Sequence, residues 1–211
     1  MKFRQPTLPI GESAGQRAKR IGLVGIDAIA LLGAVWACAL GPLETRGATP
    51  AAKEYEVKAA FLFKFALYVE WPPEVFPTPT APIIIGILGD DLFGGELDRI
   101  IRGETIKNRP IAIHRSKQID SLKHCHLLFI SKSEKGRLAS IFAKLAEKHC
   151  LTVGETDRFA HNGGIVNFRL QGANVRFEIN VEAARSSGLS ISSKLLRLAT
   201  IIGSERVKGG N

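Results

Sequence analysis

Two His-Cys pairs lie 25 residues apart in the sequence: His124-Cys125, with His126 following, and His149-Cys150. Imidazole and thiolate groups are the ligands that zinc prefers, whereas two thiols can also form a disulfide. Neighbouring residues of a strand point to opposite faces, so an adjacent His and Cys do not converge readily on one tetrahedral ion. The spacing therefore favours a role for the cysteines without a metal.

Cys125 and Cys150 each stand at the start of a predicted strand, and one βαβ unit separates them. The parallel strands of such a unit are often neighbours, about 4.8 Å apart, and a disulfide joins Cα atoms about 4.4–6.8 Å apart. We predict a Cys125–Cys150 disulfide. Two free thiols, and a zinc site that includes the flanking histidines, are the alternatives.

The N-terminus bears on the compartment in which these thiols fold. A basic cluster at residues 17–20 precedes the apolar segment 28–40, AIALLGAVWACAL. Its 13 residues suit the core of a signal peptide, roughly 7–15 residues, better than a membrane span of roughly 20. Ala37-Cys38-Ala39 fits the cleavage site of a secretory signal. The alternatives are an uncleaved membrane anchor and, ranked last, a lipoprotein signal at Cys38.

Without this leader the chain keeps two of its three cysteines, an even number suited to an oxidising compartment. We expect a signal peptide at 1–39, a linker at 40–52, one domain at 53–203 and a tail at 204–211. The first 50 residues hold six of the 29 Lys and Arg and three of the 20 Asp and Glu, so the remainder is only moderately basic. Its basic residues are scattered, which argues against a nucleic-acid partner.

Three further motifs suggest chemistry only superficially. Asp90-Asp91 follows a strand, as the acidic pair of a Mg²⁺-binding receiver domain does, but Ser131-Lys132-Ser133 supplies no third acid, so we expect Asp90 to cap a helix. Gly163-Gly164 precedes a strand and predicts a turn with positive φ. The serines at 186–193 form neither a G-x-S-x-G nor an S-x-x-K motif. The sequence thus predicts no catalytic, cofactor-binding or metal-binding residue.

Arg176, Glu178 and Asn180 alternate along one face of the last predicted strand. An antiparallel edge strand with one solvated face shows this pattern without any function. The alternative is that these three residues line a cleft or a partner-binding surface.

The segments that carry these residues alternate between strands and helices. A helix is predicted from Lys53 to Trp71, with Val57, Phe61 and Phe65 on its buried face, because these apolar residues recur every four positions. Four short apolar runs predict buried strands at 83–88, 110–114, 126–131 and 151–154. A helix with Leu138 and Ile141 on its apolar face is predicted between the last two strands.

The C-terminal third is predicted to form a hairpin and a helix. Segments 165–170 and 175–179 flank a four-residue loop, and an amphipathic helix follows with Leu195, Leu198 and Ile202 on one face. The fold class is therefore α/β: three layers, with a mainly parallel sheet, helices on both faces and a C-terminal antiparallel β-hairpin at the edge.

The order of these motifs resembles that of the YfiR-like (YfiR/HmsC) family of periplasmic proteins. The resemblance covers residues from about 54 to 203. It rests on Trp71-Pro72 after the first helix, IIIGILGDD at 83–91, Cys125 before HLLFIS, LTVGE at 151–155, Gly163-Gly164, RFEIN at 176–180 and LLRLA at 195–199.

The resemblance implies a regulator without enzymatic activity. Such proteins repress an inner-membrane diguanylate cyclase by binding its periplasmic domain. An outer-membrane-associated partner or a redox change releases the cyclase, which raises cyclic di-GMP and promotes biofilm formation. Members carry disulfides and tend to form homodimers, but the family does not fix the Cys125–Cys150 pairing. A periplasmic solute-binding or enzymatic domain that uses the Arg176, Glu178 and Asn180 face is the alternative, and the sequence offers it no nucleophile–base pair.

Overall fold

The computed structural model describes residues 49–146 and 148–203. The predicted signal peptide at 1–39 and the predicted tail at 204–211 lie outside the described residues. The first helix begins at Pro50, three residues inside the segment expected to be a linker.

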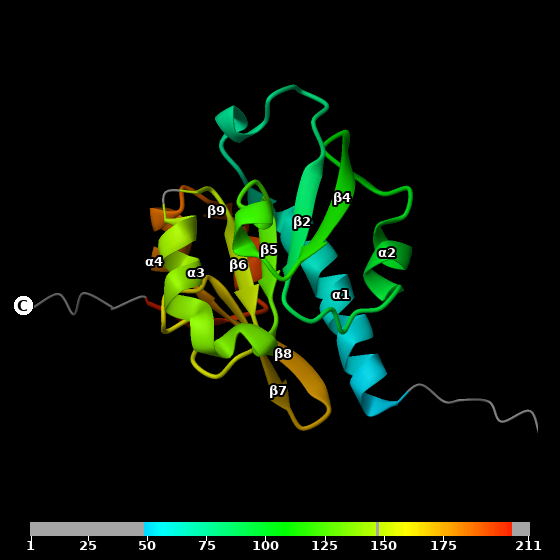
Figure 1. Cartoon of the computed structure of the whole chain (residues 1–211), viewed down its shortest axis with the longest axis vertical. Helices are drawn as coiled ribbons and strands as arrows, with labels where there is room; N and C mark the ends of the chain where they lie inside the picture. The colour runs from blue at the N-terminus through cyan, green and yellow to red at the C-terminus, as the bar shows by residue number, and fades with distance from the viewer. Residues whose placement is uncertain (1–48, 147, 204–211) are drawn as a thin grey trace, which may run out of the picture. The chain divides into compact units, whose positions relative to one another are not determined.

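An eight-stranded mixed sheet forms the centre of the domain (Figure 1). Its strand order is β10-β8-β7-β6-β5-β2-β4-β3, and its neighbours run parallel except in the pairs β7–β8 and β3–β4. The strands are β2 (Ile83–Leu88), β3 (Thr105–Ile106), β4 (Arg109–Ser116), β5 (Leu127–Ile130), β6 (Leu151–Gly154), β7 (Val166–Gln171), β8 (Asn174–Asn180) and β10 (Thr200–Ile202). A separate two-stranded sheet pairs β1 (Val69–Glu70) with β9 (Ser190–Ile191).

Helices cover both faces of the main sheet, and Figure 1 shows α1 and α3 on opposite sides of it. The α-helices are α1 (Pro50–Tyr68), α2 (Glu96–Ile101), α3 (Leu138–Leu145), α4 (Val181–Ser186) and α5 (Ser193–Leu196). The 3₁₀ helices are η1 (Pro73–Val75), η2 (Ile119–Leu122) and η3 (Lys132–Arg137).

Strand β5 shows why the sheet is buried on both faces. Leu127 and Phe129 belong to the hydrophobic core beneath α1, whereas Leu128 and Ile130 belong to the core beneath α3, and all four are fully buried. Because side chains alternate between the faces of a strand, a strand covered on both sides must be apolar throughout. The predicted α/β fold and its four apolar strands are confirmed, with ends that shift by up to two residues.

The buried face of α1 differs from the predicted one. Val57 is 43% exposed, and the buried side chains are those of Tyr55, Lys58, Ala59, Leu62, Phe65 and Ala66. A row spaced by four drifts around a helix of 3.6 residues per turn, so only Phe65 lies both on the predicted row and in the core. The rotation brings the charged Lys58 into the interior.

The C-terminal region contains the main error of the sequence prediction. The hairpin loop holds two residues, Gly172 and Ala173, rather than four. The predicted C-terminal helix ends at Leu196, and Thr200–Ile202 form β10, which pairs in parallel with β8. The hairpin is therefore not the edge of the sheet, because β10 lies outside it.

Candidate functional site

The outer half of the β7–β8 hairpin carries the polar row found in the sequence, and Figure 1 shows the hairpin extending beyond the helix layer of α3. A depression of about 410 Å³ lies here. We call its principal lining residues the hairpin surface: Arg169, Leu170, Arg176, Glu178 and Leu198.

Two arginines face each other across the hairpin. Arg169 of β7 pairs directly with Arg176 of β8, an arrangement of like charges that costs stability. Arg169 has only long ion contacts, 3.5 Å to Asp157 and 3.6 Å to Glu178. Arg176 is exposed and forms no ion pair with any residue that the structure describes. The hairpin surface therefore holds positive charge that the described residues neutralise only in part.

Glu178 and Asn180 have different environments, although the sequence placed them in one row. Glu178 accepts a hydrogen bond from the Asn167 amide at 3.2 Å and borders the hairpin surface. Asn180 instead caps α4: its side-chain oxygen accepts from Ala183 N at 2.9 Å, and its amide donates to Ala160 O at 2.8 Å. Asn180 therefore has a structural role as the cap of α4, and its part in binding a partner stays a prediction.

Two large apolar side chains are exposed near the arginines: Leu198 is 65% and Leu170 55% exposed. The side chain of Leu170 lies on the opposite face of the hairpin from Arg169, because Leu170 pairs with Val175. Sequence reasoning missed both leucines and Arg169. Leu170 could have been found from its place next to the predicted turn, but Leu198 was assigned to a helical face. Exposed apolar side chains with arginine nearby are common at protein–protein interfaces.

The two cysteines start β5 and β6 as predicted, and both are buried in the core beneath α3. The structure contains them as free thiols, so it does not contain the predicted disulfide, and the bond stays a prediction. Burial raises the pKa of the Cys125 thiol to about 12. Burial, and then the neighbouring Cys125, raise the pKa of the Cys150 thiol as well.

The histidines beside the cysteines have separate partners. His126 Nδ1 accepts from Ile84 N at 3.1 Å, and its ring stacks on Phe76 at 4.6 Å between centroids. His149 Nδ1 donates to the carbonyl of Ser187 at 2.9 Å. Within residues 49–146 and 148–203, no group of three or more His, Cys, Asp or Glu side chains is arranged to hold a metal ion.

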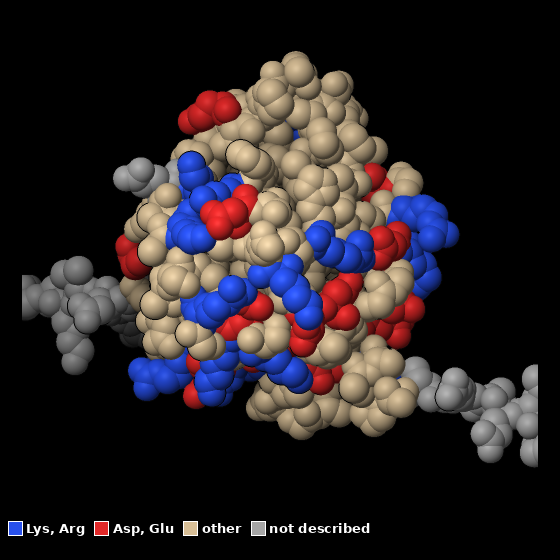
Figure 2. Space-filling model, viewed as in Figure 1, with Lys and Arg blue, Asp and Glu red and all other residues tan. Residues whose placement is uncertain are grey.

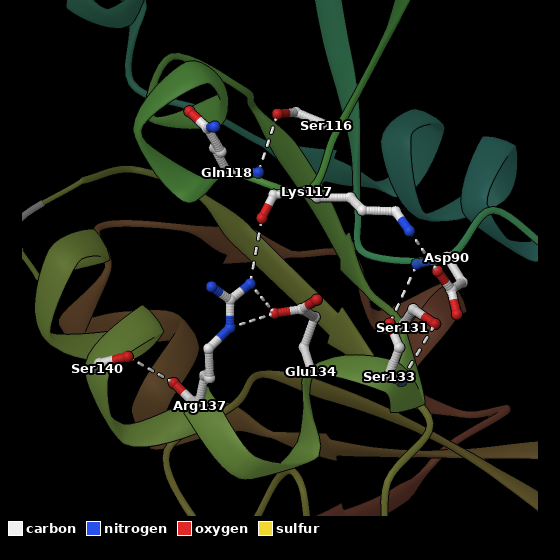
Figure 3. Close-up of polar contacts among 9 residues, drawn as sticks. All are labelled: Asp90, Ser116, Lys117, Gln118, Ser131, Ser133, Glu134, Arg137 and Ser140. Atoms are coloured by element: carbon white, nitrogen blue, oxygen red, sulfur yellow. Dashed lines mark hydrogen bonds and ion pairs between the residues drawn. The ribbon is translucent and has the colours of Figure 1, made fainter.

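The loop after β2 contacts residues that follow β4 and β5, as Figure 3 shows. Asp90 forms an ion pair with Lys117 at 3.2 Å, and its backbone N–H donates to Ser133 Oγ at 3.0 Å. Asp91, rather than the predicted Asp90, accepts from a backbone N–H ahead of α2, that of Phe93, at 2.8 Å. Both carboxylates therefore have protein partners of their own.

The glycine pair before the hairpin forms the predicted turn. Gly163 has a φ of +107°, and a Cβ atom on Gly164 would overlap the ring of Phe159. Around these elements Figure 2 shows Lys and Arg interspersed with Asp and Glu on the face that it presents. That face has no single-sign stripe of the kind that follows a nucleic-acid backbone.

Comparison with known proteins assigns the chain to a family. The model of the YfiR/HmsC-like family matches residues 55–200. A crystal structure of a conserved domain protein from Vibrio cholerae is similar with a TM-score of 0.45 and 10% identity over 70% of this chain and 59% of that chain. The structure of the ABC domain in complex with L-Trp from Streptococcus pneumonia is similar with a TM-score of 0.38 and 10% identity over 59% of this chain and 58% of that chain. The chain spans about three fifths of both structures, and no curated protein matches it.

The chain belongs to the YfiR/HmsC-like family, which confirms the resemblance seen in the sequence. This family comprises periplasmic regulators of cyclic di-GMP signalling and is not a family of enzymes. Among residues 49–146 and 148–203, no helix combines the length and the apolar character needed to cross a membrane.

Proposed function

We propose that the protein represses an inner-membrane diguanylate cyclase by binding the cyclase's periplasmic domain, and that the hairpin surface makes this contact. The observation that carries the proposal is the family match over residues 55–200, which covers nearly all of the described domain. An outer-membrane-associated protein that competes for the regulator would release the cyclase.

The composition of the hairpin surface supports its role in docking. Leu170 and Leu198 would lose exposed apolar area against a partner, and Arg176 would gain a carboxylate that the described residues do not supply. Arginine is suited to such contacts because its guanidinium binds a carboxylate through two hydrogen bonds. The partner segment that fits is thus apolar with at least one acidic side chain.

The alternative, a solute-binding or enzymatic domain, draws less support from the geometry. It relied on Arg176, Glu178 and Asn180 acting together. The Asn180 amide already donates to one backbone group and accepts from another, which leaves it one N–H and one lone pair for a substrate.

Deletion of the gene should raise cyclic di-GMP and surface attachment, and the wild-type gene should restore both. Arg176→Glu should fail to restore them, because it places a negative charge where we expect the partner's carboxylate. Arg176 is exposed, so the variant should keep the thermal midpoint of the wild type. Glu178→Arg is a poorer test than the sequence suggests, because Glu178 is hydrogen-bonded to Asn167.

Lys135→Glu is the matched control, since Lys135 is an exposed cation on η3 that does not line the hairpin surface. It should repress as the wild type does. Unchanged cyclic di-GMP after deletion, under several growth conditions, would contradict the regulatory role. If deletion raises cyclic di-GMP but the Arg176→Glu variant represses fully, the regulatory role stands and the hairpin surface is not the contact with the cyclase.

A further inference from the structure

A second pocket, of about 330 Å³, lies beside the hairpin at the carboxyl ends of β5 and β6. Lys132 follows the end of β5, Glu155 and Thr156 follow the end of β6, and Arg169 comes from the part of β7 that extends past β6. Open α/β sheets bind small molecules outside the carboxyl ends of their parallel strands. The volume is at the lower end of the roughly 300–1,000 Å³ that small-molecule sites occupy.

The inner wall of this pocket is a buried ion network in which one cation, Lys58, contacts two carboxylates, Glu54 and Glu155. Lys58 of α1 is 3% exposed, lies 2.6 Å from Glu155 and also binds Glu54. The Tyr55 hydroxyl donates to both oxygens of Glu155, at 2.9 and 3.0 Å. The backbone N–H of Lys132 contacts the same carboxylate at 3.3 Å. Glu155 therefore has little capacity to accept from a ligand.

The groups on the pocket wall outside this network are the Thr156 hydroxyl, the cations Lys132 and Arg169, and one carboxylate, Asp157, which lies 3.5 Å from Arg169 and which an anion would displace from it. The Thr156 hydroxyl is buried, with 5% of the residue exposed, and has no hydrogen-bond partner among the described residues. The Lys132 ammonium forms no ion pair with any residue in 49–146 or 148–203. The ion contacts of Arg169, at 3.5 and 3.6 Å, are longer than the roughly 2.7–2.9 Å of a charge-assisted hydrogen bond. A buried hydroxyl without a partner costs stability, which a ligand would offset.

We infer that this pocket binds a small anion, a carboxylate or a phosphate monoester, whose oxygens accept from Lys132, Arg169 and the Thr156 hydroxyl. Both groups present the acceptor oxygens that these donors require. Arg169 also belongs to the hairpin surface, so binding of the anion would be linked to binding of the partner. That consequence rests on the proposed function, whereas the anion site itself does not.

The test uses the purified mature protein without any partner. Its thermal midpoint is measured with inorganic phosphate and, separately, with succinate, each against sodium chloride at equal ionic strength. At about ten times the dissociation constant, the specific anion should raise the midpoint by roughly 3–5 °C. If only phosphate raises the midpoint, the pocket is a phosphate site, and if only succinate does, it is a carboxylate site. If each anion raises the midpoint in its own experiment, the pocket is a general anion site.

Three variants locate the binding. Lys132→Ala and Arg169→Ala should each weaken the affinity by roughly tenfold or more, and Thr156→Val by roughly threefold to tenfold. Thr156→Val keeps the side-chain shape and removes the unpartnered hydroxyl, so it should fold at least as stably as the wild type. Lys135→Ala removes a cation that does not line the pocket and should bind like the wild type. The inference is overturned if neither anion raises the thermal midpoint more than sodium chloride does. It is also overturned if the anion raises the midpoint equally in the Lys132 and Lys135 variants.

Discussion

His126 is the residue whose protonation should affect the fold most directly. Its ring is buried between Phe76 and the backbone of β2, and the Arg109 guanidinium lies 3.7 Å from the centre of the Phe76 ring. Burial, and then the charge of Arg109, lower the pKa of His126 to about 4. The imidazole must be neutral to accept from Ile84 N–H, so protonation would break this hydrogen bond.

We predict that the free energy of unfolding falls as the pH is lowered from about 6.5 to about 4. In this window the unfolded chain binds a proton at His126 and the folded chain does not, which favours unfolding at lower pH. The separation of the two pKa values corresponds to on the order of 3 kcal/mol. Denaturant unfolding across this pH range measures the loss.

His126→Asn supplies the comparison, because its side-chain oxygen can replace Nδ1 as the acceptor but does not titrate. The variant should be less stable at pH 7, since it loses the stacking on Phe76, but its stability should vary less between pH 6.5 and 4. His161→Asn, at an exposed histidine, should keep the wild-type pH dependence. If the unfolding free energy of the His126 variant depends on pH as strongly as that of the wild type, other groups cause the pH dependence.

At the scale of elements, the pairing of β5 with β6 brings the two cysteines into one core. Leu127 pairs with Leu151, and Leu151 N–H donates to His126 O at 2.8 Å, so Cys125 lies one residue out of register with Cys150. Both thiols are buried in the core beneath α3. Their raised pKa values leave very little thiolate, the reactive form, once the protein has folded. A disulfide should therefore form before the strands close over the thiols.

We predict that protein isolated from the cell envelope has no thiol that reacts with an alkylating agent after denaturation. The bond would close a loop of about 26 residues and stabilise the fold by on the order of 3.5 kcal/mol. Reduction, Cys125→Ser and Cys150→Ser should each lower the thermal midpoint by several degrees, and the double variant little further. EDTA should leave the thermal midpoint unchanged, because no metal is expected at the cysteines. If two thiols of the denatured envelope protein are alkylated, the disulfide is absent. If EDTA destabilises the protein, the histidines become candidate metal ligands again.

At the scale of the whole molecule, the structure narrows the expected site of signal cleavage. Thr49 caps α1, because its hydroxyl accepts from Ala52 N at 3.2 Å. Cleavage beyond Thr49 would remove this cap, at a cost of about 1 kcal/mol. We predict a mature N-terminus between Leu40, which cleavage after Ala39 would leave, and Thr49, and mass spectrometry of the envelope protein would show it. An intact chain from Met1 in the cytosol would contradict export.

Local residue types determined most of the architecture. The run IIIGIL at 83–88 predicts a strand covered on both faces, and it forms β2 in the interior of the sheet. Trp71-Pro72 predicts the end of the first helix to within three residues, because α1 ends at Tyr68 and Val69–Glu70 form β1. Gly163 supplies the positive φ that precedes the hairpin. These features depend on a few adjacent residues, so a single sequence contains them.

Contacts between distant segments decided the rest. The segment after Leu196 has helical periodicity, but the free edge of β8 offers backbone partners, and Thr200–Ile202 form β10 instead. Hairpin register placed Arg169 opposite Arg176, and the packing of α1 buried Lys58 against Glu155. The sequence therefore determined the apolar strands and the family, whereas both candidate sites depend on residues far apart in the chain, which only the folded sheet brings together.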